Sequence, residues 1–371
     1  MALAMVGASA GVTTVSADSP RPDRSVFGFF SYRDSAYMLS EADYSTLSTV
    51  AFASIPANGD GTLHVAEGGV PTPAWTAWNA AWMDQVIEKA HAAGARVALT
   101  VSRFAWTPDD RATTIAMLSN MDVRNALAAA IASAVTDRGV DGVNIDFEPI
   151  PFAVKWEFVA FIREVRAQLD LRAPGLELTF DATAKPGNYA IRELTAPGAA
   201  DAVFVMAYPF RDSGATTSGA TAPLGGRKYD VRATVDRYLS LTTPDKVILG
   251  LPYYSYEWST ETRYRNSRTR PAGPTYGYPK TEKISAAWAL ADKHGWRWST
   301  AENVAWTRWR YRACPSCPRT WRQVYFESRR SLGLKYDLVN SSDLLGVGFW
   351  KIGNDAGHPE LYELLRTKFG A

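Results

Sequence analysis

The chain has 371 residues, of which 46% are hydrophobic and 21% are charged, and this composition excludes a disordered polymer. Forty Lys and Arg residues stand against 38 Asp and Glu residues, so the formal charge is only +2. A dedicated nucleic-acid-binding protein usually has a strong basic excess, and we therefore expect no nucleic-acid partner.

One local cluster departs from this balance of charge. Arg263, Arg265, Arg268 and Arg270 fall within eight positions. A solvated loop is the usual explanation of such a cluster, and a contact with an anionic polymer is the alternative. Both interpretations stay open at the level of sequence.

The N-terminal segment resembles an export signal. A run of small and apolar residues ends in Val15-Ser16-Ala17, which is typical of a signal-peptidase site, although the basic residues that usually open a signal are missing. The run is too short to span a bilayer, and no later stretch reaches the roughly 18 apolar residues that a membrane helix needs. We therefore expect a signal peptide over residues 1–17, a secreted or cell-wall-associated protein, and no membrane partner.

Short apolar runs alternate with longer amphipathic segments along the chain. Alternation of strand and helix predicts parallel strands joined by right-handed crossovers. Eight such strands over about 350 residues suit a closed (β/α)8 barrel, which is an α/β fold. The expected strands are Val26–Ser31, Thr49–Ser54, Ala95–Ser102, Val140–Glu148, Leu176–Ala182, Asp201–Tyr208, Lys246–Tyr254 and Leu345–Ile352. The expected helices are Trp75–Ala93, Val123–Arg138, Phe152–Leu171, Val231–Leu241, Ser328–Asn340 and Pro359–Phe369.

An insertion interrupts this alternation before the eighth strand. The segment between Tyr254 and Ser328 is too long for a loop in a compact domain, and it contains a helix pattern of its own at Ile284–His294. We expect a barrel over residues 24–254, a small α+β subdomain over 255–327, and the seventh helix, eighth strand and eighth helix over 328–371. In an exported protein, Cys314 and Cys317 are expected to form a local disulfide of modest stabilising effect.

The candidate catalytic residues lie in the segment Asp141–Glu148 of the expected fourth strand. Because side chains alternate across a strand, Asn144, Asp146 and Glu148 share the face that points into the barrel, and the apolar residues between them face the helices. A buried polar network could explain one such residue, but three in a row at the carboxyl end of a barrel strand are typical of a catalytic site. Two close carboxylates do not ionise together easily. We therefore expect Glu148 to keep its proton to higher pH while Asp146 carries the charge.

The same segment resembles the D-x-x-D-x-D-x-E signature of glycoside hydrolase family 18, the chitinases and related N-acetylglucosaminidases, with Asn144 at the second Asp. Further similarities follow in order along nearly the whole mature chain. Val205–Tyr208 is similar to the family's M-x-Y motif, Ile248–Tyr254 to its seventh strand, and Gly346–Trp350 to its last strand. The insertion resembles the family's chitinase-insertion subdomain in place and length.

The resemblance implies a retaining, substrate-assisted mechanism without a cofactor. Glu148 would protonate the leaving oxygen and later act as base. Asp146, supported by Asn144, would hold the N–H of the sugar's acetamido group, whose carbonyl oxygen attacks the anomeric carbon, and Tyr208 would donate a hydrogen bond to that carbonyl. Trp350 would form the floor under the sugar. The other residues that the resemblance places at the substrate are Phe29, Phe52, Met206, Tyr254 and Asp141.

Two departures from the family pattern predict a cleft of different shape. Pro209 follows Tyr208 where the family often has Asp, and Asp212 is out of register. The third strand usually ends in a Ser-x-Gly-Gly turn, but here Arg103 and Phe104 follow the serine.

We expect a monomeric hydrolase that cleaves chitin-like polymers of β-1,4-linked N-acetylglucosamine. A peptidoglycan-directed N-acetylglucosaminidase and an inactive, lectin-like sugar-binding barrel are the alternatives. No metal is expected, because the four histidines lack metal-binding spacing, and the chain has no nucleophile elbow, phosphate-binding loop or dinucleotide fingerprint.

Overall fold

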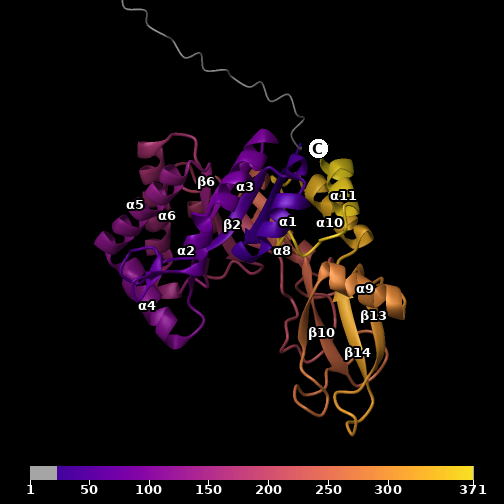
Figure 1. Ribbon diagram of the computed structural model, residues 1–371. Helices are drawn as coiled ribbons and strands as arrows, with labels where there is room; N and C mark the ends of the chain where they lie inside the picture. Colours follow the sequence, from indigo (N-terminus) through magenta and orange to yellow (C-terminus); the bar gives the residue numbers. More distant parts are fainter. Residues whose placement is uncertain (1–22, 371) are drawn as a thin grey trace, which may run out of the picture.

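The computed structural model describes residues 23–370, and its centre is a closed barrel of eight parallel strands (Figure 1). Neighbours around the barrel follow the chain order, and the last strand pairs with the first, which confirms the expected (β/α)8 fold. The expected signal peptide lies outside the described residues. The barrel strands are β1 (Ser25–Ser31), β2 (Thr49–Pro56), β5 (Arg96–Phe104), β6 (Gly142–Glu148), β7 (Glu177–Thr183), β8 (Ala202–Met206), β9 (Val247–Pro252) and β15 (Gly346–Trp350).

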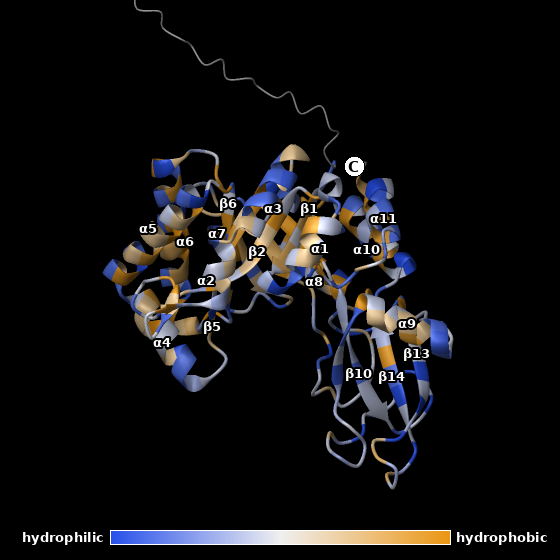
Figure 2. Cartoon of the chain, viewed as in Figure 1, coloured by the Kyte–Doolittle hydropathy of each residue, from blue (hydrophilic) through white to orange (hydrophobic). Residues whose placement is uncertain are grey.

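Helices surround the barrel and bury their apolar sides against the strands, as the hydropathy colours of Figure 2 show. No helix formed by the described residues combines the length and apolar character needed to cross a membrane. The helices around the barrel are α1 (Ser35–Ser40), α2 (Pro73–Trp78), α3 (Ala81–Ala92), α4 (Pro108–Ser119), α5 (Met121–Arg138), α6 (Lys155–Arg172), α7 (Ile191–Leu194), α8 (Val231–Leu239), α10 (Arg329–Ser341) and α11 (Glu360–Phe369).

The helix expected over Trp75–Ala93 is two helices, because Asn79 ends α2 by donating from its side chain to the carbonyl oxygen of Trp75 at 2.8 Å. The sequence interpretation also missed α4. Its start carries a local signal, since the Thr107 hydroxyl caps the backbone N–H of Asp110 at 3.1 Å, with a proline at the first helical position.

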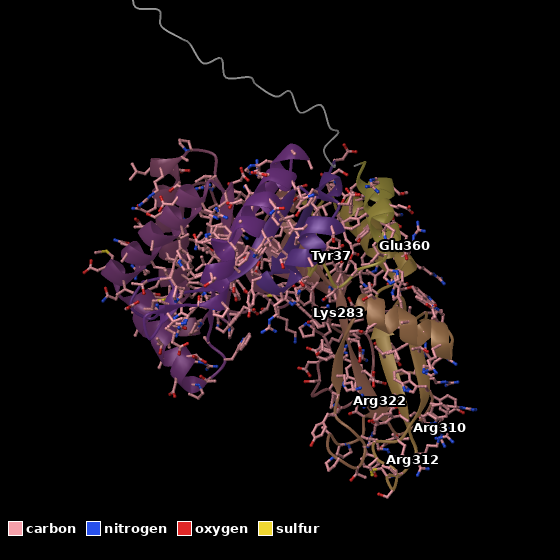
Figure 3. The ribbon with its side chains drawn as sticks, in the orientation of Figure 1. Tyr37, Lys283, Arg310, Arg312, Arg322 and Glu360 are labelled. Carbon is pink, nitrogen blue, oxygen red and sulfur yellow. A yellow bond between two sulfur atoms is a disulfide. The ribbon has the colours of Figure 1, made fainter. Side chains whose placement is uncertain are left out.

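The insertion is a five-stranded antiparallel sheet that projects from one side of the barrel (Figure 1). It lies between the seventh and eighth barrel strands, as expected, and α9 (Ile284–His294) packs against its β13 and β14 strands. The Arg263 cluster falls on the loop that joins its first two strands. Figure 3 shows Arg310 on the outer side of the sheet and Arg312 near the far end of the insertion, whereas Arg322 is buried within the sheet. The strands are β10 (Tyr254–Thr260), β11 (Lys280–Lys283), β12 (Arg297–Ser299), β13 (Val304–Tyr311) and β14 (Thr320–Phe326), and β3 (Ala66–Glu67) and β4 (Val70–Pro71) form a separate hairpin.

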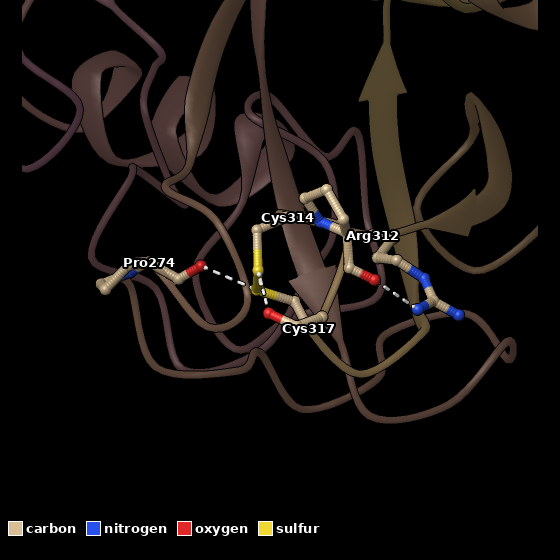
Figure 4. The surroundings of a disulfide bond; sticks show 6 residues. Pro274, Arg312, Cys314 and Cys317 are labelled. Atoms are coloured by element: carbon tan, nitrogen blue, oxygen red, sulfur yellow. Dashed lines mark hydrogen bonds between the residues drawn. A yellow bond between two sulfur atoms is a disulfide. The ribbon is translucent and has the colours of Figure 1, made fainter.

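Cys314 and Cys317 form the expected disulfide in the loop between β13 and β14 (Figure 4). The backbone N–H of Cys317 donates to the carbonyl oxygen of Cys314 at 3.0 Å, and the Arg312 guanidinium donates to the carbonyl oxygen of Pro315 at 2.8 Å. The bridge therefore staples one tight turn at the far end of the insertion.

The barrel interior is filled below the site by aromatic rings. Phe204 packs edge-on against Phe29, with ring centroids 4.9 Å apart. Gly250 and Gly348 flank Phe204, and a Cβ atom on either glycine would lie 2.4 Å from its ring. The two glycines thus make room for a large side chain on the barrel axis, and this side chain supports the floor of the cleft.

Candidate active site

The polar row of β6 points into the barrel as expected. Asn144 is fully buried and Asp146 is 7% exposed. Phe147, between Asp146 and Glu148, faces the other way and stacks on Phe161 of α6 with centroids 5.3 Å apart. The alternation of the strand therefore brings an amide and two carboxyl groups to the inner face, ending at the cleft.

Asp181 on β7 completes this row, and the sequence interpretation missed it. Strands β6 and β7 pair in parallel, with Ile145 opposite Phe180. The next residues along the two strands, Asp146 and Asp181, therefore lie side by side. The Asn144 amide donates to Asp181 Oδ2 at 3.1 Å. Asn144 therefore supports Asp146 through Asp181 and not directly. The available signal was the alternation of polar residues along β7.

The carboxyl group of Asp146 lies between those of Glu148 and Asp181 and shares hydrogen bonds with both. Burial raises the pKa of Asp146 well above its usual value, and the charges and hydrogen bonds of its two neighbours raise it further. The hydrogen bond from Asp146 lowers the pKa of Glu148 and of Asp181, against the larger effect of burial, which raises both.

Of the causes named, those that act on Asp146 all raise its pKa, whereas hydrogen bonds oppose the rise at Glu148 and Asp181, so these directions favour the proton on Asp146. This corrects the expectation that Asp146 carries the charge. The expectation rested on Glu148 alone as a neighbour, whereas the tertiary structure adds a second acid on β7. The expected rise in the pKa of Glu148 is present, and its cause is burial.

Two tyrosines stand beside the carboxyl groups. Tyr208 follows β8 and Tyr254 begins β10, and their rings meet edge to face with centroids 5.9 Å apart. Burial raises the pKa of both phenols, so both stay neutral and can donate hydrogen bonds. Trp350, at the end of β15, rests on Phe29 with centroids 5.5 Å apart.

These groups open into one cleft of about 750 Å³. It brings together six of the expected site residues, namely Asp146, Glu148, Met206, Tyr208, Tyr254 and Trp350. The rim also carries Phe104 and Trp106, whose rings stack 4.2 Å apart. Phe104 stands at the turn where the sequence predicted a cleft of different shape, whereas Trp106 was not expected at the site. The lining residues that the sequence interpretation missed are Trp106, Asp181, Thr183, Ala184, Lys185, Phe210, Arg227, Tyr229 and Tyr256.

Two expected aromatic walls do not line the cleft. Phe52 faces the helices, where its ring packs 5.2 Å from that of Trp78, because the alanines on either side of it occupy the inner face of β2. Phe29 is buried beneath Trp350 and supports the floor from below.

Asp141 is also misplaced by the sequence interpretation. It precedes the other end of β6, about 20 Å from Glu148 at the usual rise of a strand. Its carboxylate accepts from the backbone N–H of Val97 at 2.8 Å and bonds to the His91 ring at 2.7 Å. Asp141 therefore links the starts of β5 and β6, at the end of the barrel opposite the cleft, and does not reach the substrate site.

The two departures from the family pattern have structural consequences. Pro209 lines the cleft, whereas the Asp212 carboxylate accepts from the backbone N–H of Gly214 at 2.9 Å and shapes its own loop. Arg103 turns toward α4 and donates to the hydroxyl of Thr114 at 3.1 Å. The cleft wall after β5 is therefore formed by the rings of Phe104 and Trp106, and not by exposed backbone as in the family's glycine turn.

A (β/α)8 barrel with adjoining carboxyl groups, a phenol and an aromatic floor in one open cleft is the architecture of a glycoside-hydrolysing enzyme. The model of the glycosyl hydrolases family 18 matches residues 28–355. The chain belongs to this family.

Individual relatives are similar over part of their length. The chain is 24% identical over 264 residues to the cortical fragment-lytic enzyme of Bacillus subtilis, covering 68% of this chain and 55% of that protein. It is 23% identical over 228 residues to the di-N-acetylchitobiase of Mus musculus, covering 57% of this chain and 60% of that protein. The chain thus spans little more than half the length of these curated relatives.

Solved structures share the fold. The family 18 chitinase of Cycas revoluta in complex with (GlcNAc)3 has a TM-score of 0.74 at 18% identity, covering 92% of this chain and 99% of that one. The spore cortex-lytic enzyme SleL of Bacillus megaterium has a TM-score of 0.74 at 19% identity, covering 94% of this chain and 75% of that one.

Proposed function

We propose that this protein is a glycosidase that cleaves polymers of β-1,4-linked N-acetylglucosamine with retention of configuration, by substrate-assisted acid–base catalysis. The observation that carries the proposal is that the carboxyl groups of Asp146, Glu148 and Asp181 adjoin one another in the lining of one cleft. Cleavage of a glycosidic bond requires an acid that can donate a proton to the leaving oxygen, and these carboxyl groups lie where a bound sugar can reach them.

Glu148 is the acid in this proposal. It ends β6, lines the cleft, and has a pKa that burial raises, so it can keep a proton for the leaving oxygen. When Glu148 is ionised in the free protein, the proton of Asp146 can pass to it as substrate binds. Asp146 is then ionised and accepts a hydrogen bond from the acetamido N–H.

The acetamido carbonyl oxygen is the nucleophile. It forms a bond to the anomeric carbon as the bond from that carbon to the leaving oxygen breaks, and Glu148 supplies the proton to the leaving group. Tyr208 stays neutral and donates a hydrogen bond to the carbonyl oxygen. Glu148, now a carboxylate, takes a proton from water, which attacks the anomeric carbon and restores the acetamido group with the original configuration.

The test compares wild type with Glu148→Gln and Asp146→Ala on a chromogenic chito-oligosaccharide. Both variants should lose at least about a hundredfold in kcat, the usual contribution of a positioned acid or base. Near-normal turnover by a folded Asp146→Ala protein would exclude the substrate-assisted mechanism. If wild type and Glu148→Gln are equally inactive while the protein still binds chitin, the lectin-like alternative replaces this proposal.

The polymer itself is proposed as chitin-like, with peptidoglycan as the second candidate. Both contain a 2-acetamido sugar in β-1,4 linkage, and the proposed catalytic residues contact only the acetamido group and the glycosidic oxygen of that sugar. We also propose that the protein is monomeric. Residues 1–17, which resemble an export signal, support the further proposal that it is secreted or associated with the cell wall. Sequencing the N-terminus of protein recovered from the culture medium tests export.

A further inference from the structure

The charged residues that line the cleft fall into two groups of opposite sign. Asp146, Glu148 and Asp181 form the catalytic row. The other charged lining residues among the described part of the chain are Lys185 and Arg227, which are both exposed. No residue of the proposed reaction needs these two cations, so they call for a different explanation.

The two cations come from neighbouring loops that are fastened to each other. Lys185 follows β7, and Arg227 lies on the loop that leads into α8. The Tyr229 hydroxyl donates to the carbonyl oxygen of Ala184 at 3.0 Å, which ties one loop to the other. The Lys185 ammonium lies 4.9 Å from the centre of the Tyr229 ring. The chain therefore holds Lys185 against the same residue that anchors the loop of Arg227.

The loop of Arg227 is fixed at its other end as well. Its backbone N–H donates to Asp230 Oδ2 at 3.4 Å, and Asp230 caps α8 by accepting from the backbone N–H of Ala233 at 3.1 Å. The carboxylate of Asp230 is thus occupied with backbone groups and does not form an ion pair with the Arg227 side chain.

Among residues 23–370, neither cation has a carboxylate within ion-pair distance. The charge of Glu302 acts on Arg227, but Arg211 already forms a buried ion pair with this acid. Partial burial and the charge of Arg211 lower the pKa of Arg227, while the charges of Glu302 and Asp230 raise it. An anion placed beside Arg227 would favour its charged form, because it would pair a cation that has no ion-pair partner among the described residues.

A neutral polymer offers these cations weaker partners than a carboxylate. The hydroxyl and carbonyl oxygens of chitin can accept hydrogen bonds from Lys185 and Arg227, but such bonds lack the charge pairing that makes a bond to a carboxylate stronger. A substrate with carboxylates would be repelled by the ionised member of the catalytic row unless cations offset that charge. Lys185 and Arg227 are placed to do so, on the β7–β8 side of the cleft.

We propose that Lys185 and Arg227 form a subsite for a carboxylate carried by the sugar polymer. This inference rests on the proposed function and narrows its substrate class to an acidic N-acetylhexosamine polymer. The carboxylate is either an acid group attached directly to a sugar ring or the carboxylate of a peptide attached to that ring. Both have the same chemistry at the two cations.

The test measures binding in the Glu148→Gln background, so that it does not depend on turnover. Isothermal titration compares muramic-acid-containing glycan fragments with the same fragments after their carboxylates have been converted to amides. The free acids should bind at least about tenfold more tightly, which corresponds to one charge-assisted contact. Lys185→Gln with Arg227→Gln should abolish this preference. Fragments stripped of peptide, measured beside fragments that retain it, tell which carboxylate is bound.

Lys228→Gln is the matched control, because Lys228 is an exposed cation next to Arg227 that does not line the cleft. It should keep the full preference for the free acid. The preference should also shrink as the salt concentration rises from 0.05 to about 0.5 M, because screening weakens exposed pairs. Equal affinity for acid and amide in the parent protein, or a preference that survives the double substitution, overturns the subsite.

This outcome is separable from failure of the proposed function. A protein that hydrolyses chito-oligosaccharides but binds acid and amide equally keeps the proposed reaction and loses the subsite. A protein that prefers the acid but hydrolyses no glycan, with Glu148 intact, keeps the subsite and loses the reaction.

Discussion

The carboxyl groups of Asp146 and Asp181 meet inside the barrel because β6 and β7 pair in parallel and in matching register. The charge of Asp181 raises the pKa of Asp146, because two adjoining buried acids do not ionise together easily. The Asn144 amide donates to Asp181 and so favours charge on Asp181 and a proton on Asp146. We therefore expect this relationship to influence the pH range in which the site works.

Replacing Asp181 with Asn should therefore shift the alkaline limb of the activity profile to lower pH. The charge of Asp181 and its hydrogen bond both raise the pKa of Asp146, and the substitution removes the charge. Asp146 would then lose its proton earlier as pH rises. Values of kcat/KM for a chromogenic chito-oligosaccharide, measured from pH 4 to about 9, report this limb. An unchanged limb would mean that Asp181 does not control the proton of Asp146.

The same acids should make the folded protein less stable at high pH. The pKa values of Asp146 and Asp181 are raised in the folded protein, so the folded state retains protons that the unfolded chain releases near pH 4. The contribution of these two acids to stability is then greatest below that pH and falls as pH rises toward the folded pKa values. Asp181→Asn should therefore become more stable relative to wild type as the pH is raised from about 5 to about 8, because the Asn side chain has no charged form to bury. Urea unfolding at the two pH values measures the difference, and parallel losses in both proteins would contradict it.

A buried ion pair joins the insertion to the barrel. The Lys335 ammonium on α10 donates to Glu327, which follows β14, at 2.5 Å, and both side chains are almost completely buried. Lys335→Met would leave the Glu327 charge without its partner and should cost about 3–5 kcal/mol of unfolding free energy. Adding Glu327→Gln should recover most of this loss, because it removes the stranded charge.

The matched control for that pair is on the surface. Lys368 bonds to Asp337 at 2.5 Å, but the side chains are 28% and 55% exposed. Lys368→Met should change the unfolding free energy by no more than about 1 kcal/mol. A loss of the same size at Lys335 and Lys368 would show that burial does not govern the first pair.

Trp350 should contribute mainly to sugar binding. Its ring ends β15 above Phe29 and forms part of the cleft, and a flat aromatic face suits the apolar face of a pyranose. Trp350→Ala should lower kcat/KM by at least about tenfold, and Trp350→Phe by less, through lost apolar contact. Trp296, 45% exposed on the insertion and outside the cleft lining, serves as the control, and Trp296→Ala should keep normal turnover. Equal losses in the Ala and Phe variants of Trp350 would argue against a stacking role.

Local sequence was sufficient for the barrel and for part of the site. The order of strands and helices follows from hydrophobic periodicity, and the inward row of Asn144, Asp146 and Glu148 follows from the two-residue repeat of a strand, because both are properties of consecutive residues. The same rule placed Phe52 wrongly. Which of the two faces of β2 turns inward depends on its neighbours β1 and β5, and the alanines beside Phe52 take the inner face.

The sequence by itself determined the order of strands and helices along the chain, the inward row of polar residues on β6 and the local disulfide, since each depends on patterns among nearby residues. Only the tertiary structure decided that Asp181 joins that row, that the proton rests on Asp146, and that Lys185 and Arg227 face the cleft together. These features depend on the register between strands and on contacts between separate loops. Such contacts form when the barrel closes, and no spacing along one segment encodes them.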